Sequence, residues 1–237
     1  MQNKKTLLQR LLVIYITFFI VLVASIAHSV LTDFTRGAAE GVELGEDIAE
    51  KWSSGTPRMI YMLGDIRVTG QPEAAVEIAA APGVEIKANV RKLGLVVEQD
   101  APGTSPLGLA FRSIGGSAWL YALVMLCPLL YLAIIVLMFV IIHSLRRSIR
   151  EERTLDKRNV WYLRAIGMLT IVTELISNTV NWVMNSRAAE LLAGSGYTVD
   201  ASFHISYAMI IMGILILFAA EVFAIGQNLS EEQKLTI

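Results

Sequence analysis

The stretch that decides the fold of this chain is "VWYLRAIGMLTIVTELISNTVNWV", residues 160–183, which is mostly apolar. A bilayer core about 30 Å thick needs roughly 20 apolar residues in helical form. Arg164 and Glu174 are the only charged residues in the stretch, and a charge that faces lipid is costly. The stretch therefore predicts a membrane helix that turns its polar residues away from lipid.

Six residues of this stretch, four of them polar, recur at helical spacing. Neighbouring positions lie alternately three and four residues apart, which places them on one face of a helix. We call this set the polar stripe: Arg164, Gly167, Ile171, Glu174, Asn178 and Asn181. We expect the polar stripe to face the interior of a helical bundle.

Three further apolar runs accompany this one, and only 17% of the whole chain is charged, against about 25% in soluble domains. The sequence therefore predicts an α-helical integral membrane protein, a four-span helix bundle with a small α+β extracytoplasmic domain between spans one and two. The predicted segments are the N-terminus with span one at 1–31, the extracytoplasmic domain at 32–117, span two at 118–143, a basic loop at 144–159, span three at 160–183, an outer loop at 184–204, span four at 205–225 and a tail at 226–237.

Lysine and arginine predict the orientation. Six of them lie in the basic loop 144–159, and Lys4, Lys5 and Arg10 precede span one. Such residues gather on the cytoplasmic side of a membrane. Both termini and the basic loop are therefore expected in the cytoplasm.

Residues 32–117 carry the signals of a small α+β domain. Residues 34–52 have helical spacing, "RMIYMLGDIRVTG" at 58–70 is apolar in short runs, and apolar residues alternate with polar ones from Val84 to Val90. Such alternation is typical of a strand. We expect a small antiparallel sheet, and residues 101–118 are interpreted as a linker into span two. A solvated cap is favoured over a ligand site.

Glu221 stands just inside the end of span four. Because spans three and four run in opposite directions, Glu221 is expected at about the depth of Arg164. The sequence therefore predicts an ion pair between Arg164 and Glu221 that holds two helices together, and this role is favoured over gating or transport.

Glu174 lies deeper and has no obvious basic partner. His28 and His204 are candidates at a similar depth. A protonated Glu174 that bonds to Asn178 is an equal alternative, because burial raises the pKa of a carboxyl.

The tail has its own local signals. Gly226 is predicted to end span four as a cap, and Ser230 with Gln233 fits a capping pattern for a new short helix. Leu235 and Ile237 give this tail apolar residues with which it can fold back on the bundle.

Catalytic and nucleotide-binding motifs are not found in the sequence. It contains no glycine-rich nucleotide pattern, no HExxH and no GxSxG. Cys127 is the only cysteine, and the net charge is −1. We expect no enzyme, no metal, no cofactor and no direct contact with nucleic acid.

Two segments resemble a known family. "LRAIGMLTIVTELIS" at 163–177 and "FAAEVFAIGQNLSEEQKLTI" at 218–237 resemble the bacterial membrane proteins catalogued as domain of unknown function 2975. The resemblance rests on the positions Arg164, Gly167, Glu221, Val222, Phe223, Gly226, Leu229, Glu232, Leu235 and Thr236. It extends over the four predicted spans and implies a bacterial cytoplasmic (inner) membrane protein without an established activity.

The resemblance also suggests a partner. Family members often stand beside a very short helix-turn-helix regulator, which implies a cytoplasmic protein partner in addition to the lipid bilayer. The favoured function is a non-enzymatic sensor or anchor for that partner. The alternative is a small-solute or ion-handling protein that uses Glu174, Asn178 and Asn181; a membrane enzyme ranks third.

Overall fold

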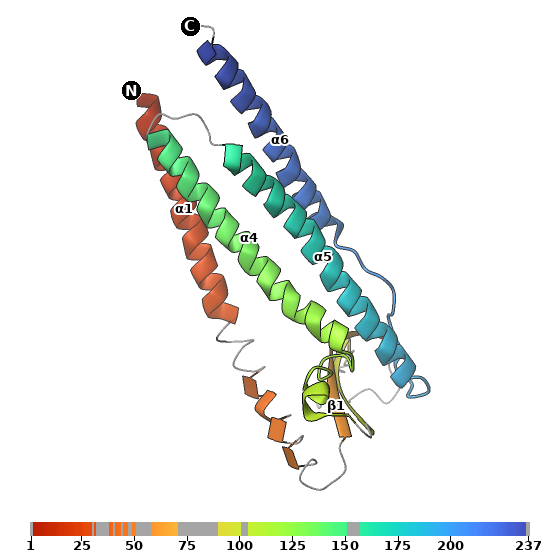
Figure 1. Cartoon of the computed structure of the whole chain (residues 1–237). Helices are drawn as coiled ribbons and strands as arrows, with labels where there is room; N and C mark the ends of the chain where they lie inside the picture. The colour runs from red at the N-terminus through yellow and green to blue at the C-terminus, as the bar shows by residue number, and fades with distance from the viewer. Residues whose placement is uncertain are drawn as a thin grey trace, which may run out of the picture. The chain divides into compact units, whose positions relative to one another are not determined.

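A computed structural model of the chain describes residues 2–29, 31, 38–39, 41–43, 45–46, 49–50, 58–70, 90–100, 104–150 and 157–235. It is mostly helical with one small sheet (Figure 1). The elements are α1 (Gln2–Ser29), β1 (Arg58–Gly70), β2 (Lys92–Asp100), α3 (Pro106–Ala110), α4 (Ala118–Arg150), α5 (Lys157–Leu191), β3 (Thr198–Val199) and α6 (Tyr207–Leu235).

The contacts divide the chain into two units. The helical unit consists of Met1–Gly45, Leu129–Glu174 and Ser206–Ile237, and the sheet unit consists of Glu46–Pro128 and Leu175–Ile205. Helices α4 and α5 belong partly to each unit. Each unit is described by itself below.

Among the residues that the structure describes, three helices are long and apolar enough to cross a membrane. The candidate spans are Ala118–Ser148 in α4, Lys157–Leu191 in α5 and Tyr207–Asn228 in α6. Helices α4 and α5 contain the predicted spans two and three and continue past their predicted bounds, whereas α6 begins two residues after the predicted start of span four and continues past its predicted end. The apolar part of α1 among the described residues, Tyr15–His28, is shorter.

In the helical unit, α1 packs on α4 through aromatic rings. The ring of Phe139 lies 6.4 Å from that of Tyr15 and 5.5 Å from that of Phe18, both edge to face. Aromatic pairs prefer this arrangement because the positive edge of one ring meets the negative face of the other. The first apolar run is thus held against α4.

The sheet is antiparallel, in the order β2-β1-β3. This confirms the predicted antiparallel sheet, and the described residues between 38 and 50 are helical, as predicted. The predicted strand begins later than expected, since residues 90–91 are not in a strand and β2 starts at Lys92. The alternation from 84 to 89 lies outside the described residues.

Two segments that the sequence presents as connections complete the sheet. Met62 N–H donates to the carbonyl of Ser113 at 2.9 Å, and Gly115 N–H donates to the carbonyl of Met62 at 3.0 Å. The interpretation of 101–118 as a linker is therefore wrong, because its last part pairs with β1. Strand β3, from the predicted outer loop, pairs with the far end of the same edge.

The core of the sheet unit lies between the sheet and two helices. Leu63 and Ile66 of β1 are fully buried, in one cluster with Leu120 of α4 and with Val180 and Ala188 of α5. Burying a large aliphatic side chain stabilises a fold by about 1.5–3 kcal/mol. The sheet therefore depends on α4 and α5, and its core extends beyond the predicted 32–117 domain.

A buried amide fixes α5 to β1. The Asn185 carboxamide, 5% exposed, accepts a bond from Arg67 N–H at 2.9 Å and donates to the carbonyl of Asn181 at 2.8 Å. Without Asn185, the backbone N–H of Arg67 would lose its partner, at a cost of about 1–3 kcal/mol for a buried group. The side chain thus links one turn of α5 to one position of the sheet.

The segment after β3 is ordered by a local polar cluster. The hydroxyl and the backbone N–H of Ser202 donate to the Asp200 carboxylate. These bonds, and the smaller effects of His204 and Arg67, hold the pKa of Asp200 below its ordinary value. His204 Nε2 lies 3.3 Å from Asp200 Oδ2, so this histidine is engaged within its own segment.

Candidate functional site: the contact between α5 and α6

The polar stripe of α5 meets α6 over much of its length. Four of its six residues have contacts to α6 or to the residue that precedes it: Arg164, Gly167, Ile171 and Glu174. All four belong to the helical unit. The stripe is therefore largely the surface that α5 presents to α6.

The predicted ion pair is present in the structure. Arg164 Nε lies 2.8 Å from Glu221 Oε1, and Arg164 Nη2 lies 2.9 Å from Oε2, so the pair is bidentate. This geometry gives strong, oriented charge-assisted hydrogen bonds. The side chains remain 48% and 57% exposed, so the expectation that Arg164 faces the interior is wrong: the pair bridges the surface of the two helices.

Next to the pair, the two helix backbones come very close. A β-carbon added at Gly167 would lie 2.8 Å from the carbonyl oxygen of Gly213, and one added at Gly213 would lie 2.5 Å from Cγ1 of Ile171. Both distances are shorter than ordinary carbon contacts. Small residues allow such close approach between membrane helices, where packing supplies much of the association energy. Gly213 was not identified from the sequence as a contact residue, because a glycine in an apolar run carries no polar signal.

The side chain of Glu174, a residue of α5, contacts the residue that precedes α6. Its Oε1 accepts a hydrogen bond from Ser206 N–H at 3.1 Å. The carbonyl of Ser206 accepts bonds from Met209 N–H and Ile210 N–H, so Ser206 is the residue from which α6 begins. The N-terminus of a helix carries partial positive charge and favours a carboxylate. The sequence did not predict this partner; protonation of Glu174 stays a prediction.

The last two stripe residues lie in the sheet unit. Asn178 is half-buried and Asn181 is exposed. The backbone carbonyl of Asn181 accepts the bond from Asn185. The expectation that Asn181 faces the bundle interior is wrong, and the buried amide of this region is Asn185, one turn further along α5.

The tail continues the last helix. Helix α6 runs without interruption from Tyr207 to Leu235, so the predicted helix end at Gly226 and the new helix start at Ser230 are both wrong. Glu232 is also within α6, while Thr236 lies outside the described residues. The predicted fold-back of this tail does not occur over the residues up to 235.

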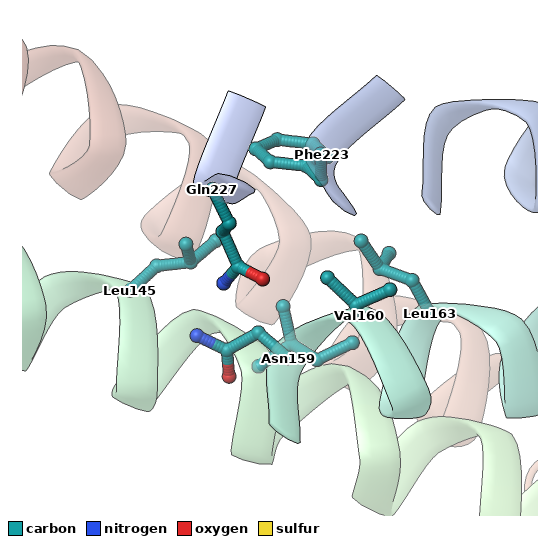
Figure 2. Close-up of a pocket in the computed structure, with 7 residues that line it drawn as sticks. Leu145, Asn159, Val160, Leu163, Phe223 and Gln227 are labelled. Atoms are coloured by element: carbon teal, nitrogen blue, oxygen red, sulfur yellow. The ribbon is translucent and has the colours of Figure 1, made fainter. Parts of the chain in front are cut away.

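A pocket lies near the start of α5. It is lined by Asn159, Gln227, Leu145, Val160, Leu163 and Phe223, together with Ile141, and we call it the Asn159 pocket (Figure 2). The side chains come from α4, α5 and α6 within the helical unit. Asn159 and Gln227 are each 4% exposed. The sequence did not predict that these two residues are buried. Both lie at the polar ends of apolar runs, where the spacing of apolar residues does not show which side chains are buried.

The described residues show no cluster of three or more histidine, cysteine or acidic side chains that could hold a metal. The polar groups of the α5–α6 contact are instead paired with helix ends and with one another. This arrangement can hold helices in register.

The three long apolar helices indicate a membrane protein of the α-helical class. A family model described as protein of unknown function (DUF2975) matches residues 92–237. Because this is more than half of the chain, the protein belongs to that family. The match begins at β2 and includes α4, α5 and α6, but it does not include the first predicted span. The comparisons with curated proteins and with solved structures found no match.

The glycine contact gives a prediction with a matched control on the same helix. Gly213→Ala should lower the thermal midpoint of the protein in detergent, because the new methyl group meets Ile171 and the backbone of Gly167. Gly226→Ala meets nothing within 4 Å. Alanine favours a helix over glycine by about 0.5–1 kcal/mol, so this variant should be unchanged or more stable. Equal effects of the two substitutions would contradict the close helix contact.

Proposed function

We propose that this protein is a non-enzymatic sensor in a bacterial inner membrane, with four spans, an extracytoplasmic α+β domain and a cytoplasmic protein partner. The sheet unit would receive the signal, and the cytoplasmic ends of the helices would present it. A small helix-turn-helix regulator is the partner that the family resemblance suggests. The chain would act through that partner and would not itself contact nucleic acid.

The observation that carries this proposal is the shared core of the sheet unit. Leu120 of α4 and Ala188 of α5 are fully buried in the cluster that contains Leu63 of β1. A ligand or force that moves the sheet would therefore act directly on two long helices. Each helix is continuous, α4 over Ala118–Arg150 and α5 over Lys157–Leu191, so a displacement has a rigid element along which to travel.

The orientation rests on the basic residues between α4 and α5. Six lysines and arginines lie in 144–159, whereas residues 192–206, which join α5 to α6, contain none. The positive-inside rule then places the sheet unit outside the cytoplasm. It also places both termini inside if α1 is a fourth span.

The orientation can be tested by labelling single cysteines in a Cys127→Ala background. Arg146 lies near the end of α4 and Glu190 near the end of α5, and both are exposed. In intact cells an impermeant thiol reagent should label Glu190→Cys and spare Arg146→Cys until the cells are broken. Labelling of Arg146→Cys in unbroken cells would contradict the proposed topology.

The alternative, a solute or ion pathway along the polar stripe, gains no specific support. Gly167 and Ile171 are closed by the contact with α6, and Asn181 lies on the surface. The contacts favour helix packing as the role of this face.

The sensor proposal is tested by capture of the full-length chain with its partner from native membranes. A small helix-turn-helix protein should be recovered with the tagged wild type. Asn185→Leu, which breaks the link between α5 and β1, should change that recovery at equal expression. Asn181→Leu is the matched control, because the exposed Asn181 side chain lies one turn away, and it should leave recovery unchanged.

The outcomes separate the possible roles. Equal recovery with wild type and both variants would show an anchor that does not respond to the sheet unit. Reproducible failure to recover a DNA-binding protein with the wild type would contradict the proposed partner.

A further inference from the structure

The Asn159 pocket is a small apolar hollow between α4, α5 and α6. Every part of its surface that a ligand can touch is apolar, and the polar atoms of the Asn159 carboxamide are fully covered. Its cavity of about 70 Å³ has room for a few heavy atoms, since one water molecule occupies about 30 Å³ in the liquid. In the view of Figure 2, Leu145 and Leu163 lie on opposite sides of it and Phe223 lies above them. An occupant of this pocket must therefore be hydrocarbon.

The pocket lies where three candidate spans end. Its lining residues belong to the last two turns of the span in α4, the first two turns of α5 and the last two turns of the span in α6. The ring of Phe223, which forms part of the wall, is 42% exposed. At this depth in a membrane the surrounding hydrocarbon is the acyl chain of a lipid.

An aromatic pair on α5 fits the same depth. Trp161 is 62% exposed, and its ring lies edge to face with that of Tyr162 at 5.7 Å. Tryptophan and tyrosine are typical of the boundary between hydrocarbon and headgroups, because their rings are amphipathic. The first turns of α5 therefore have the composition of a headgroup boundary.

Arginines adjoin the lining residues. The charged residues that stand next to a lining residue in the sequence are Arg146, Arg158 and Arg164. Arg164 is paired with Glu221, and Arg146 and Arg158 are exposed. A guanidinium has five N–H donors and binds phosphate oxygens in pairs, so Arg158 can bind a phosphate in addition to its interaction within the chain. The charge beside the pocket therefore favours an anionic headgroup.

The spacing of the arginines and the pocket matches a lipid. Arg146 follows the lining residue Ile141 by five positions on α4, and Arg158 precedes Leu163 by five on α5. Five residues of helix are about 7 Å long. The polar layer on each face of a bilayer is about 5–8 Å thick, because a bilayer of about 40–45 Å has a hydrocarbon core of about 30 Å. A lipid with its phosphate at the arginines therefore has the start of its acyl chains at the pocket.

We propose that the Asn159 pocket, together with Arg146 and Arg158, binds one anionic phospholipid of the surrounding bilayer. An acyl chain occupies the apolar hollow, and the phosphate lies at the two arginines. A zwitterionic lipid has the same chains and phosphate but adds a cation, which the arginines repel. The proposal concerns the helical unit alone and depends neither on the proposed partner nor on the orientation. It goes beyond the sensor proposal by giving this end of the helices a lipid ligand.

The test is native mass spectrometry of the full chain, purified in detergent and titrated with dioleoyl phosphatidylglycerol. Dioleoyl phosphatidylcholine is the comparison, because the two lipids have the same chains and phosphodiester and differ in net charge. One phosphatidylglycerol should remain bound per chain, with an affinity at least fivefold higher than that of phosphatidylcholine.

The headgroup contact is tested by a charge variant with a matched control. Arg146→Gln should weaken the binding of phosphatidylglycerol about fivefold, which is the effect of one basic residue near an anionic lipid surface. It should leave the binding of phosphatidylcholine unchanged. Arg112→Gln removes the same charge from an exposed residue of the sheet unit and should change neither affinity.

The apolar contact is tested by a variant that fills the hollow. Leu163→Trp keeps both arginines and should weaken the binding of both lipids at least fivefold. Leu175→Trp is its control, because Leu175 is an exposed residue of the same helix that does not line the pocket, and it should bind like the wild type. Arg146→Gln changes an exposed side chain and decides the question even if Leu163→Trp folds poorly.

Two results would overturn the proposal. Equal binding of the two lipids by the wild type would exclude a site for an anionic headgroup. Unchanged binding of phosphatidylglycerol in both Arg146→Gln and Leu163→Trp would place the lipid elsewhere on the protein. The purified chain carries no partner protein, so either result leaves the sensor proposal to its own test.

Discussion

A charged residue in an apolar helix needs a partner on a neighbouring helix, and for Arg164 this partner is Glu221. The bidentate geometry fixes the rotation of both helices and their relative position along the helix axes. Gly167 follows Arg164 by about one helical turn, and Gly213 precedes Glu221 by about two turns. Once the ion pair has formed, the two glycines face each other and the helix backbones can come together. The Ser206 end of α6 then lies at Glu174, so a single register satisfies a charge pair, a close backbone contact and a helix start.

The sheet unit follows a different principle, because its core is built from two kinds of element. Apolar residues of β1 need a surface to bury them, and the ends of α4 and α5 provide it. The Asn185 carboxamide then gives this packing a fixed register, since it bonds to one backbone N–H of the sheet. Nonpolar burial supplies the stabilisation, and one directional polar contact sets the alignment.

The sequence predicted what depends on composition and periodicity. Apolar runs gave three of the long helices, and the spacing of the polar stripe identified the face of α5 that meets α6. The depth of Glu221 was enough to pair it with Arg164. Each of these inferences uses information that lies within one helix or in the order of the helices.

What the sequence did not predict depends on partners that are distant along the chain. Gly213 and Asn185 have no local pattern that marks them, because their roles arise from Ile171 and from the Arg67 backbone. At Gly226 a local signal was misleading, since glycine often ends a helix. The following residues, 231–235, are good helix formers, and α6 continues through them to Leu235.

The central claim is that a half-exposed ion pair holds α5 and α6 together, and a double-mutant cycle in detergent tests it most directly. Arg164→Ala and Glu221→Ala should each lower the thermal midpoint, because each leaves the other charge without its partner on an otherwise apolar surface. The double mutant should lose clearly less than the sum of the two. A second cycle of Arg164→Ala with Glu190→Ala, an exposed residue on the same helix, should be additive. Additive losses in the Arg164–Glu221 cycle would contradict the account, because the two side chains would then contribute to stability independently.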